Sequence, residues 1–215
     1  MQLKSLLSIS LVVICSYSFG QKGKDEINFS DPFQIDSSDY FIIPRLIGGE
    51  NTEMYGKGKG YLPWGNYRDI HFYNLKTNQT KKLFGSTLAI ISTFNHRRYY
   101  YYDQPKTAET PENFLPGHII YLAITENYSN DNGLDSDDPL YLYISSKTGD
   151  NLTQITPKGL SVQSWTASKD KKTILVKLLN DKNGNRKFGT GDDEVYYRID
   201  LNDDISKIKC YPIVM

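Results

Sequence analysis

The sequence is short of cysteine and histidine. It contains two cysteines, Cys15 and Cys210, and three histidines, whose positions show no spacing typical of a zinc site. Removal of an N-terminal segment that includes Cys15 would leave Cys210 alone, so no disulfide could form within the remaining chain. Cys210 lies in an apolar run, which is typical of a small buried side chain rather than of a nucleophile. A bound ion could then take the place of a disulfide in stabilising the fold.

The chain also lacks net charge and the common signatures of hydrolases. It has 25 Lys and Arg residues against 25 Asp and Glu residues, so it creates no overall field that would attract nucleic acid or an anionic membrane. We therefore expect no nucleic-acid partner. No Gly-x-Ser-x-Gly or His-Glu-x-x-His motif occurs. The carboxylates of glycosidases can lie far apart in sequence, so a polysaccharide hydrolase or lyase is the alternative to a non-catalytic protein.

The N-terminus has the pattern of an export signal. A lysine precedes an apolar run at 6–14, and small residues follow at the spacing that a signal peptidase requires. The run is too short to cross a bilayer comfortably, so we expect no transmembrane span. We predict a signal peptide at 1–20 and a single all-β domain at 21–215, in a protein that is periplasmic, secreted or at the cell surface. Alternatives are a buried N-terminal element, and lipidation at Cys15, which the large preceding residue disfavours.

The rest of the sequence favours β structure. It is rich in aromatic and turn residues, with 17 Tyr, 9 Phe, 16 Gly and 9 Pro, and its apolar residues alternate or form short runs bounded by turn residues. The runs at 118–124 and 173–179 are expected to be central strands buried on both faces. Residues 106–115 could hold a short helix, although two prolines disfavour it.

The expected strands follow a repeating plan. Residues 68–84, 139–156 and 194–209 each consist of a strand, a polar turn and a second strand. Before the third hairpin, residues 165–176 form a polar turn that leads into a buried strand. We therefore expect about three units of four short antiparallel strands, with neighbouring units burying each other's faces.

Two segments of the third unit resemble a blade of the TolB-like β-propeller repeats. Residues 168–176 match a Ser-x-Asp-Gly-Lys turn that leads into a strand, with Lys171 in place of the usual glycine, and 195–201 match the Leu-Tyr-x-x-Asp strand. Residues 141–156 resemble the outer hairpin of such a blade. The resemblance implies a β-propeller, but closed propellers generally have four or more blades. We thus expect an incomplete or distorted propeller, with a β-sandwich as the alternative.

Two loops of twelve residues have the pattern of calcium sites. Residues 127–138 and 181–192 carry oxygen-bearing side chains at positions 1, 3 and 5, an apolar residue at 8 and Asp at 12. Calcium takes about six to eight oxygen ligands, which such a loop supplies from alternate side chains and a backbone carbonyl. By position they resemble EF-hand or dockerin loops, but with strands expected on both sides. The expected ligands are Asn127, Ser129, Asp131, Gly133 (carbonyl), Asp135 and Asp138 in the first loop, and Asp181, Asn183, Asn185, Lys187 (carbonyl) and Asp192 in the second.

Other features of these loops limit the prediction. Asn132 and Arg186 stand at the sharp turn where glycine is usual, and arginine is a poor match there. Asn, Asp, Gly and Ser are also the residues of ordinary turns, so plain turns are the alternative. Asn127 begins a glycosylation sequon, and a glycan would prevent it from binding metal. Because Asn and Ser replace several carboxylates, we expect modest calcium affinity, with a Kd of about 10⁻⁴ to 10⁻³ M.

Two further segments attract notice. The four tyrosines at 99–102 could stack against sugar or peptide, or could simply form an edge strand. The glycine-rich run at 56–60 has the composition of a phosphate loop but lacks the flanking strand and helix, which indicates an ordinary loop.

Taken together, the sequence predicts an exported, non-catalytic calcium-binding β-repeat protein whose partner is an envelope protein or a glycan. The polysaccharide hydrolase or lyase with structural calcium is the alternative. A third possibility is a small subunit that docks onto another propeller through its exposed sheet edges.

Overall fold

A computed structural model describes residues 27–35, 38–47, 67–94, 117–131 and 133–215. All the sheet pairings in it are antiparallel, and the predicted all-β class is confirmed. The predicted signal peptide at 1–20, Cys15, the glycine-rich run, the tyrosine run, the possible helix at 106–115 and Asn132 lie outside the described residues. Within the described residues no helix is long and apolar enough to span a membrane.

The strands follow one another along the chain in three groups of four. The first group contains β1 (Phe33–Gln34), β2 (Tyr40–Leu46), β3 (Tyr67–Asn74) and β4 (Gln79–Lys82). The second contains β5 (Ile90–Phe94), β6 (His118–Ile124), β7 (Leu140–Ser146) and β8 (Thr153–Gln154). The third contains β9 (Leu160–Ala167), β10 (Thr173–Asn180), β11 (Asp193–Asp200) and β12 (Lys209–Pro212), with a 3₁₀ turn, η2 (Ile205–Lys207), between the last two.

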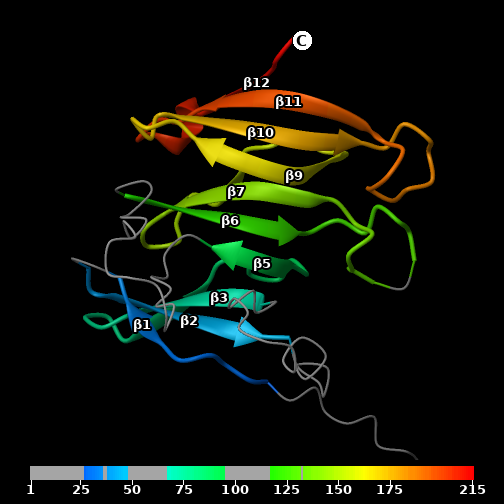
Figure 1. The fold of residues 1–215 in the computed structure, drawn as a ribbon. Coiled ribbons are helices and arrows are strands. Elements are labelled where there is room, and N and C mark those ends of the chain that lie inside the picture. The colour runs from blue at the N-terminus through cyan, green and yellow to red at the C-terminus, as the bar shows by residue number, and fades with distance from the viewer. Residues whose placement is uncertain (1–26, 36–37, 48–66, 95–116, 132) are drawn as a thin grey trace, which may run out of the picture.

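Within each group every strand pairs with the next one along the chain. One pairing, Tyr67 with Ile91, joins β3 to β5 and links the first two groups into an eight-stranded sheet. The third group is a separate sheet. Figure 1 shows the three groups stacked one above another. The predicted plan of four short antiparallel strands per unit therefore agrees with the structure, and no pairing among the described strands joins the third group back to the first.

The middle group holds the stack together because β6 is buried on both faces. Ile119, Tyr121 and Ala123 enter an apolar cluster shared with the first group. Ile120 and Leu122 enter a second cluster shared with the third group. Successive side chains of a strand point to opposite faces, so one strand contributes to two cores. The prediction for 118–124 is confirmed.

The corresponding prediction for 173–179 is correct in that β10 lies between two other strands of its sheet, but wrong in that only one of its faces is buried. Ile174, Val176 and Leu178 of β10 are fully buried, but Leu175 is 49 % exposed. The outer face of this sheet also carries charged side chains, with an ion pair between Lys177 and Glu194 at 2.5 Å. Among the described residues no layer covers this face, so it has the polar character of a terminal unit in a stack. The continuous apolar run at 173–179 predicted burial of both faces of the strand, but only one face of β10 is buried.

The turn before β10 holds one residue in the left-handed region of the backbone. The Ser168 hydroxyl accepts a hydrogen bond from the Thr173 amide at 3.0 Å, and the Asp170 carboxylate accepts one from the Lys172 amide at 3.1 Å. Lys171 lies between them with φ of 58°, in the left-handed region that suits glycine. Lysine therefore occupies this position at some conformational cost.

The first and second groups meet closely at Gly149, in the turn between β7 and β8. A Cβ atom at Gly149 would lie 2.5 Å from the Phe72 ring, and the residue has φ of +74°. Gly159 has the same φ, but a Cβ atom there would meet nothing within 4 Å. Alanine substitutions at these two glycines therefore distinguish the free-energy cost of a steric clash from the cost of backbone strain alone.

We predict that Gly149→Ala destabilises the fold by about 2–4 kcal/mol, because Phe72 must move out of a packed core. Gly159→Ala should cost only about 1 kcal/mol, from the left-handed conformation alone. Urea denaturation of the two variants measures the difference. Equal losses would contradict the close contact between the turn and Phe72.

Candidate functional site

The two candidate calcium loops occupy equivalent places in successive groups. Residues 127–138 lie in the connection between β6 and β7, and residues 181–192 in the connection between β10 and β11. Each joins the second strand of its group to the third, and both lie at the same end of the stack (Figure 1). Their flanks are strands, as expected.

The first loop folds around the side chains of Asn127 and Asp138. The Asn127 Oδ1 atom accepts hydrogen bonds from the amides of Asn130 at 2.7 Å and Asp131 at 3.2 Å. Asp138 is buried, with only 2 % of the residue exposed. Its two oxygens accept from the amides of Ser129 and Asp135, each at 3.0 Å. The two ends of the loop are thus fixed by side-chain oxygens that point inward.

The second loop is held in the same manner. The Asp181 carboxylate accepts from the amides of Gly184 at 2.8 Å and Arg186 at 2.9 Å. The Asp192 carboxylate accepts from the Gly189 amide at 2.9 Å and from the Asn183 side chain at 3.1 Å. Most of this loop is exposed to solvent.

Counted from the first residue of each loop, the same hydrogen bonds recur. The side-chain oxygen at position 1 accepts from the amide at position 4, and the oxygen at position 5 accepts from the amide at position 7. The carboxylate at position 12 accepts from the amide at position 9. Position 3 contacts position 12 in both loops, through its backbone amide in the first and its side-chain amide in the second. The register read from the sequence therefore corresponds to a shared hydrogen-bonding plan.

The backbone conformations agree as well. Position 4 is left-handed in both loops, with φ of 62° at Asn130 and 70° at Gly184. Arg186, at the turn position where glycine is usual, has φ of 61°. An arginine in this region is uncommon, and the hydrogen bond from its amide to Asp181 helps to hold it there.

The loops also contact each other, which sequence reasoning did not anticipate. The rings of Tyr128 and Phe188 pack with their centroids 5.3 Å apart. The Tyr128 hydroxyl lies 3.4 Å from the Asp181 carboxylate. The Lys187 ammonium forms an ion pair with the Asp137 carboxylate at 2.6 Å. Burial, together with the charge of Asp181, raises the pKa of Tyr128. The hydrogen bond to Asp137, with the further charges of the first loop, raises the pKa of Lys187.

The chemistry of the loops suits a hard cation. Carboxylate, amide and hydroxyl oxygens are the ligands that calcium prefers. A carboxylate has about four lone-pair sites, so accepting one or two amide hydrogens leaves capacity to bind an ion. Within the described ranges no group of three or more His, Cys, Asp and Glu side chains is placed to hold a metal. A calcium ion would therefore depend on Asn, Ser and backbone oxygens as well.

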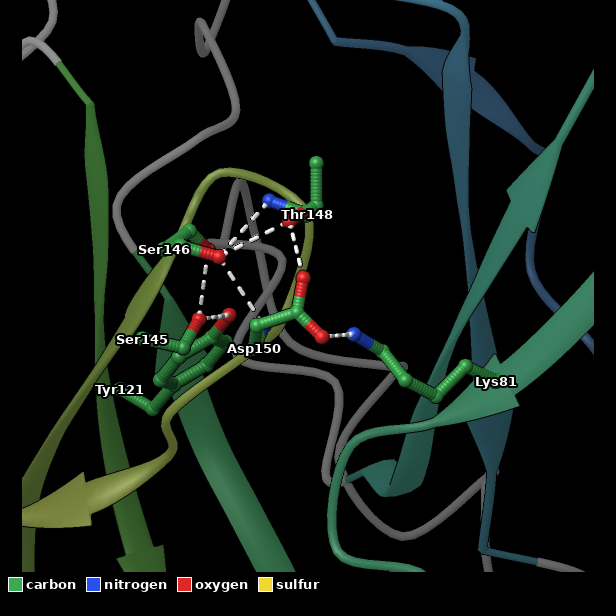
Figure 2. A network of polar contacts seen from close by, with 6 residues as sticks. All are labelled: Lys81, Tyr121, Ser145, Ser146, Thr148 and Asp150. Carbon is green, nitrogen blue, oxygen red and sulfur yellow. Dashed lines mark hydrogen bonds and ion pairs between the residues drawn. The ribbon is translucent and has the colours of Figure 1, made fainter.

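A second polar cluster joins the first and second groups (Figure 2). Lys81 of β4 pairs with Asp150 in the turn after β7. The Thr148 hydroxyl donates to the other Asp150 oxygen at 2.5 Å, and the Ser146 hydroxyl accepts from the Asp150 amide at 3.0 Å. Next to this turn, the buried Tyr121 hydroxyl pairs with Ser145 at 2.8 Å.

This cluster has the residue types of a catalytic site but the arrangement of a structural one. A serine nucleophile needs an adjacent base to remove its proton. The Ser145 hydroxyl donates instead to the Ser146 carbonyl at 2.8 Å, and the Lys81 ammonium is paired with Asp150. The cluster therefore connects the first two strand groups through a well-bonded turn.

Cys210 in β12 is half-buried, and burial raises the pKa of its thiol to about 11. A thiol with so high a pKa is a poor nucleophile at neutral pH, which agrees with the expected structural role.

We predict that the link between Lys81 and Asp150 depends on pH. The hydrogen bonds from Lys81 and Thr148 lower the pKa of Asp150 in the folded state. The carboxylate therefore stabilises the fold above its unfolded pKa of about 3.9, and this contribution is lost as the pH falls through the lower folded value.

A double-mutant cycle of Lys81→Met and Asp150→Asn tests this. Both side chains are substantially exposed, so we expect a coupling of about 0.2–1 kcal/mol at pH 7. The coupling should fall as the pH drops through the lowered folded pKa of Asp150, and it should approach zero once the carboxylate is protonated. A coupling that is independent of pH would contradict the ion pair.

No protein-family model fits the chain, and no curated protein sequence aligns with it significantly.

Proposed function

We propose that this chain is an exported, non-catalytic calcium-binding protein that acts as a binding module. The observation that carries the proposal is the equivalence of the two loops, which repeat one hydrogen-bonding plan at the same place in successive groups. Ordinary turns need not share a twelve-residue register. A requirement to surround the same kind of ion would give that result.

The proposed ligands are side-chain and backbone oxygen atoms of the two loops. In the first loop they come from Asn127, Ser129, Asp131, Gly133 (carbonyl), Asp135 and Asp138, and in the second from Asp181, Asn183, Asn185, Lys187 (carbonyl) and Asp192. Calcium supplies a double positive charge that offsets repulsion among the carboxylates. An ion that binds only the folded loops stabilises the fold by mass action.

The proposed partner is an envelope protein or a glycan. Because the loops pack against each other through Tyr128 and Phe188, an ion in either one would help to order both. The role proposed for calcium is therefore to stiffen one end of the stacked sheets so that the surface beside it keeps its shape.

Calcium should raise the melting temperature. With a Kd of about 0.5 mM, 5 mM calcium would add about 1.4 kcal/mol of stability. For a chain of this size that corresponds to a rise of about 3–6 °C. Isothermal titration calorimetry on the purified protein should detect heat over the same range, and magnesium should have a smaller effect.

Variants locate the site. Asp131→Ala in the first loop and Asp181→Ala in the second should each reduce the calcium-dependent rise while the protein still folds. The matched control is Asp203→Ala, an exposed acidic residue outside both loops, which should respond to calcium like the wild type. The proposal fails if the wild type shows neither heat nor a change in melting temperature.

A further inference from the structure

A cavity of about 620 Å³ opens where the first and second groups meet. Its size lies within the range of small-molecule sites, which often form between structural units. Its lining combines apolar side chains from one group with polar and charged side chains mostly from the other. None of the predicted calcium ligands takes part in it.

The wall from the first group is a rigid turn that follows β4. Asp69 of β3 is buried, and its carboxylate accepts hydrogen bonds from the amides of Ile70 at 2.8 Å and Phe84 at 3.0 Å. The Thr87 amide closes the turn by donating to the Phe84 carbonyl at 3.1 Å. Leu83, Phe84 and Thr87 are thereby presented to the cavity by a backbone that is fixed from within.

The opposite wall carries a chain of hydrogen-bonding groups. The Tyr143 hydroxyl pairs with the Thr125 hydroxyl at 2.7 Å and donates to the Gln154 amide oxygen at 3.0 Å. The Gln154 nitrogen donates in turn to the Thr156 carbonyl at 2.9 Å. The Tyr143 ring packs edge-to-face on the Phe84 ring, with the ring centroids 5.3 Å apart. This contact joins the wall from the second group to the wall from the first group. The wall offers both donors and acceptors at fixed positions.

Two charges of opposite sign stand at the cavity. The Glu126 carboxylate accepts a hydrogen bond from the hydroxyl of the buried Tyr141 at 2.9 Å, and that hydroxyl also accepts from the Gly159 amide at 3.0 Å. Lys158 precedes Gly159 and also lines the cavity. In the described part of the chain neither Glu126 nor Lys158 belongs to an ion pair. Both charged groups therefore have capacity to bind a ligand, and together they carry no net charge.

We propose that this cavity binds a short neutral oligosaccharide. A sugar ring has an apolar C–H face and an edge of hydroxyls that both donate and accept. The apolar wall of Leu83, Phe84 and Leu152 matches the C–H face of the sugar. The wall of Thr125, Tyr143 and Gln154 matches its hydroxyl groups. Because Glu126 and Lys158 together carry no net charge, the cavity favours neither an anionic nor a cationic ligand, and a purely apolar ligand would leave polar groups without partners. The pre-set hydrogen bonds reduce the entropy lost on binding.

This inference rests on the proposed function, because it specifies the glycan among the possible partners. The test uses purified full-length protein in 5 mM calcium with cellotriose, maltotriose, mannotriose and chitotriose as probes. Saturation-transfer NMR detects binding, and calorimetry gives Kd. We expect at least one trisaccharide to bind with a Kd below about 1 mM.

Variants then assign the site. Glu126→Gln keeps the acceptor for Tyr141 but removes the charge, and Gln154→Leu removes the amide. Each should weaken binding by about 10-fold or more, as expected for one hydrogen bond to a ligand. Lys172→Met, an exposed lysine away from this cavity, is the control and should not change Kd. Circular dichroism checks that each variant is folded.

The outcomes are distinct. Weakened binding in the cavity variants alone supports the proposal. Binding that none of the cavity variants affects would overturn it, as would no binding of any trisaccharide at 10 mM, or binding of free amino acids or dipeptides instead. The calcium response of the same samples is independent of the cavity, so loss of sugar binding with a normal calcium response leaves the proposed calcium sites standing.

Discussion

The whole arrangement depends on β6, the strand whose side chains alternate between two apolar cores. Ile119 and Tyr121 belong to one core and Ile120 to the other, so the second group is covered on both faces while the outer groups pack through one. Each group is too thin to bury its apolar residues alone, and the stack is stable only because neighbours share their faces. The two candidate loops and the cavity lie where this stacking brings connections together.

The stacking brings together residues that are far apart in sequence. The two twelve-residue loops leave their sheets at the same end, and the packing of Tyr128 on Phe188 follows from the spacing of the groups. At the seam between the first two groups, the same geometry places Lys81 beside Asp150 and Phe84 beside Tyr143. The loops and the cavity are therefore two products of one stacking arrangement.

Much of the fold could be predicted from local patterns. Alternating apolar residues and turn residues gave the strand groups, and the continuous run at 118–124 gave a strand buried on both faces. The same rule failed at 173–179, because burial of the second face depends on what lies beyond the sheet, and residue order does not record that. The outward side of β10 differs from β6 chiefly in Lys177, a single charge within an apolar run.

The register of the loops was visible in the sequence because the residue types at positions 1, 5 and 12 are constrained by bonds within each loop. The contact between Lys187 and Asp137 was not visible, because it joins two loops through tertiary structure. The cavity was missed for the same reason. Its lining comes from segments between Leu83 and Lys158 that have no common motif. The position of Glu126 at the cavity became apparent only from its hydrogen bond with Tyr141, which lies 15 residues away in the sequence.

The charged outer face of the third group has a consequence for assembly. Any further sheet that stacked there would have to remove Lys177, Glu194, Arg198 and Asp200 from water, and desolvating such pairs generally costs more than their mutual attraction returns. Face-to-face polymerisation through this surface is thereby discouraged, even though Leu175 is exposed within it. The charged side chains therefore disfavour the addition of further stacked sheets to the third group.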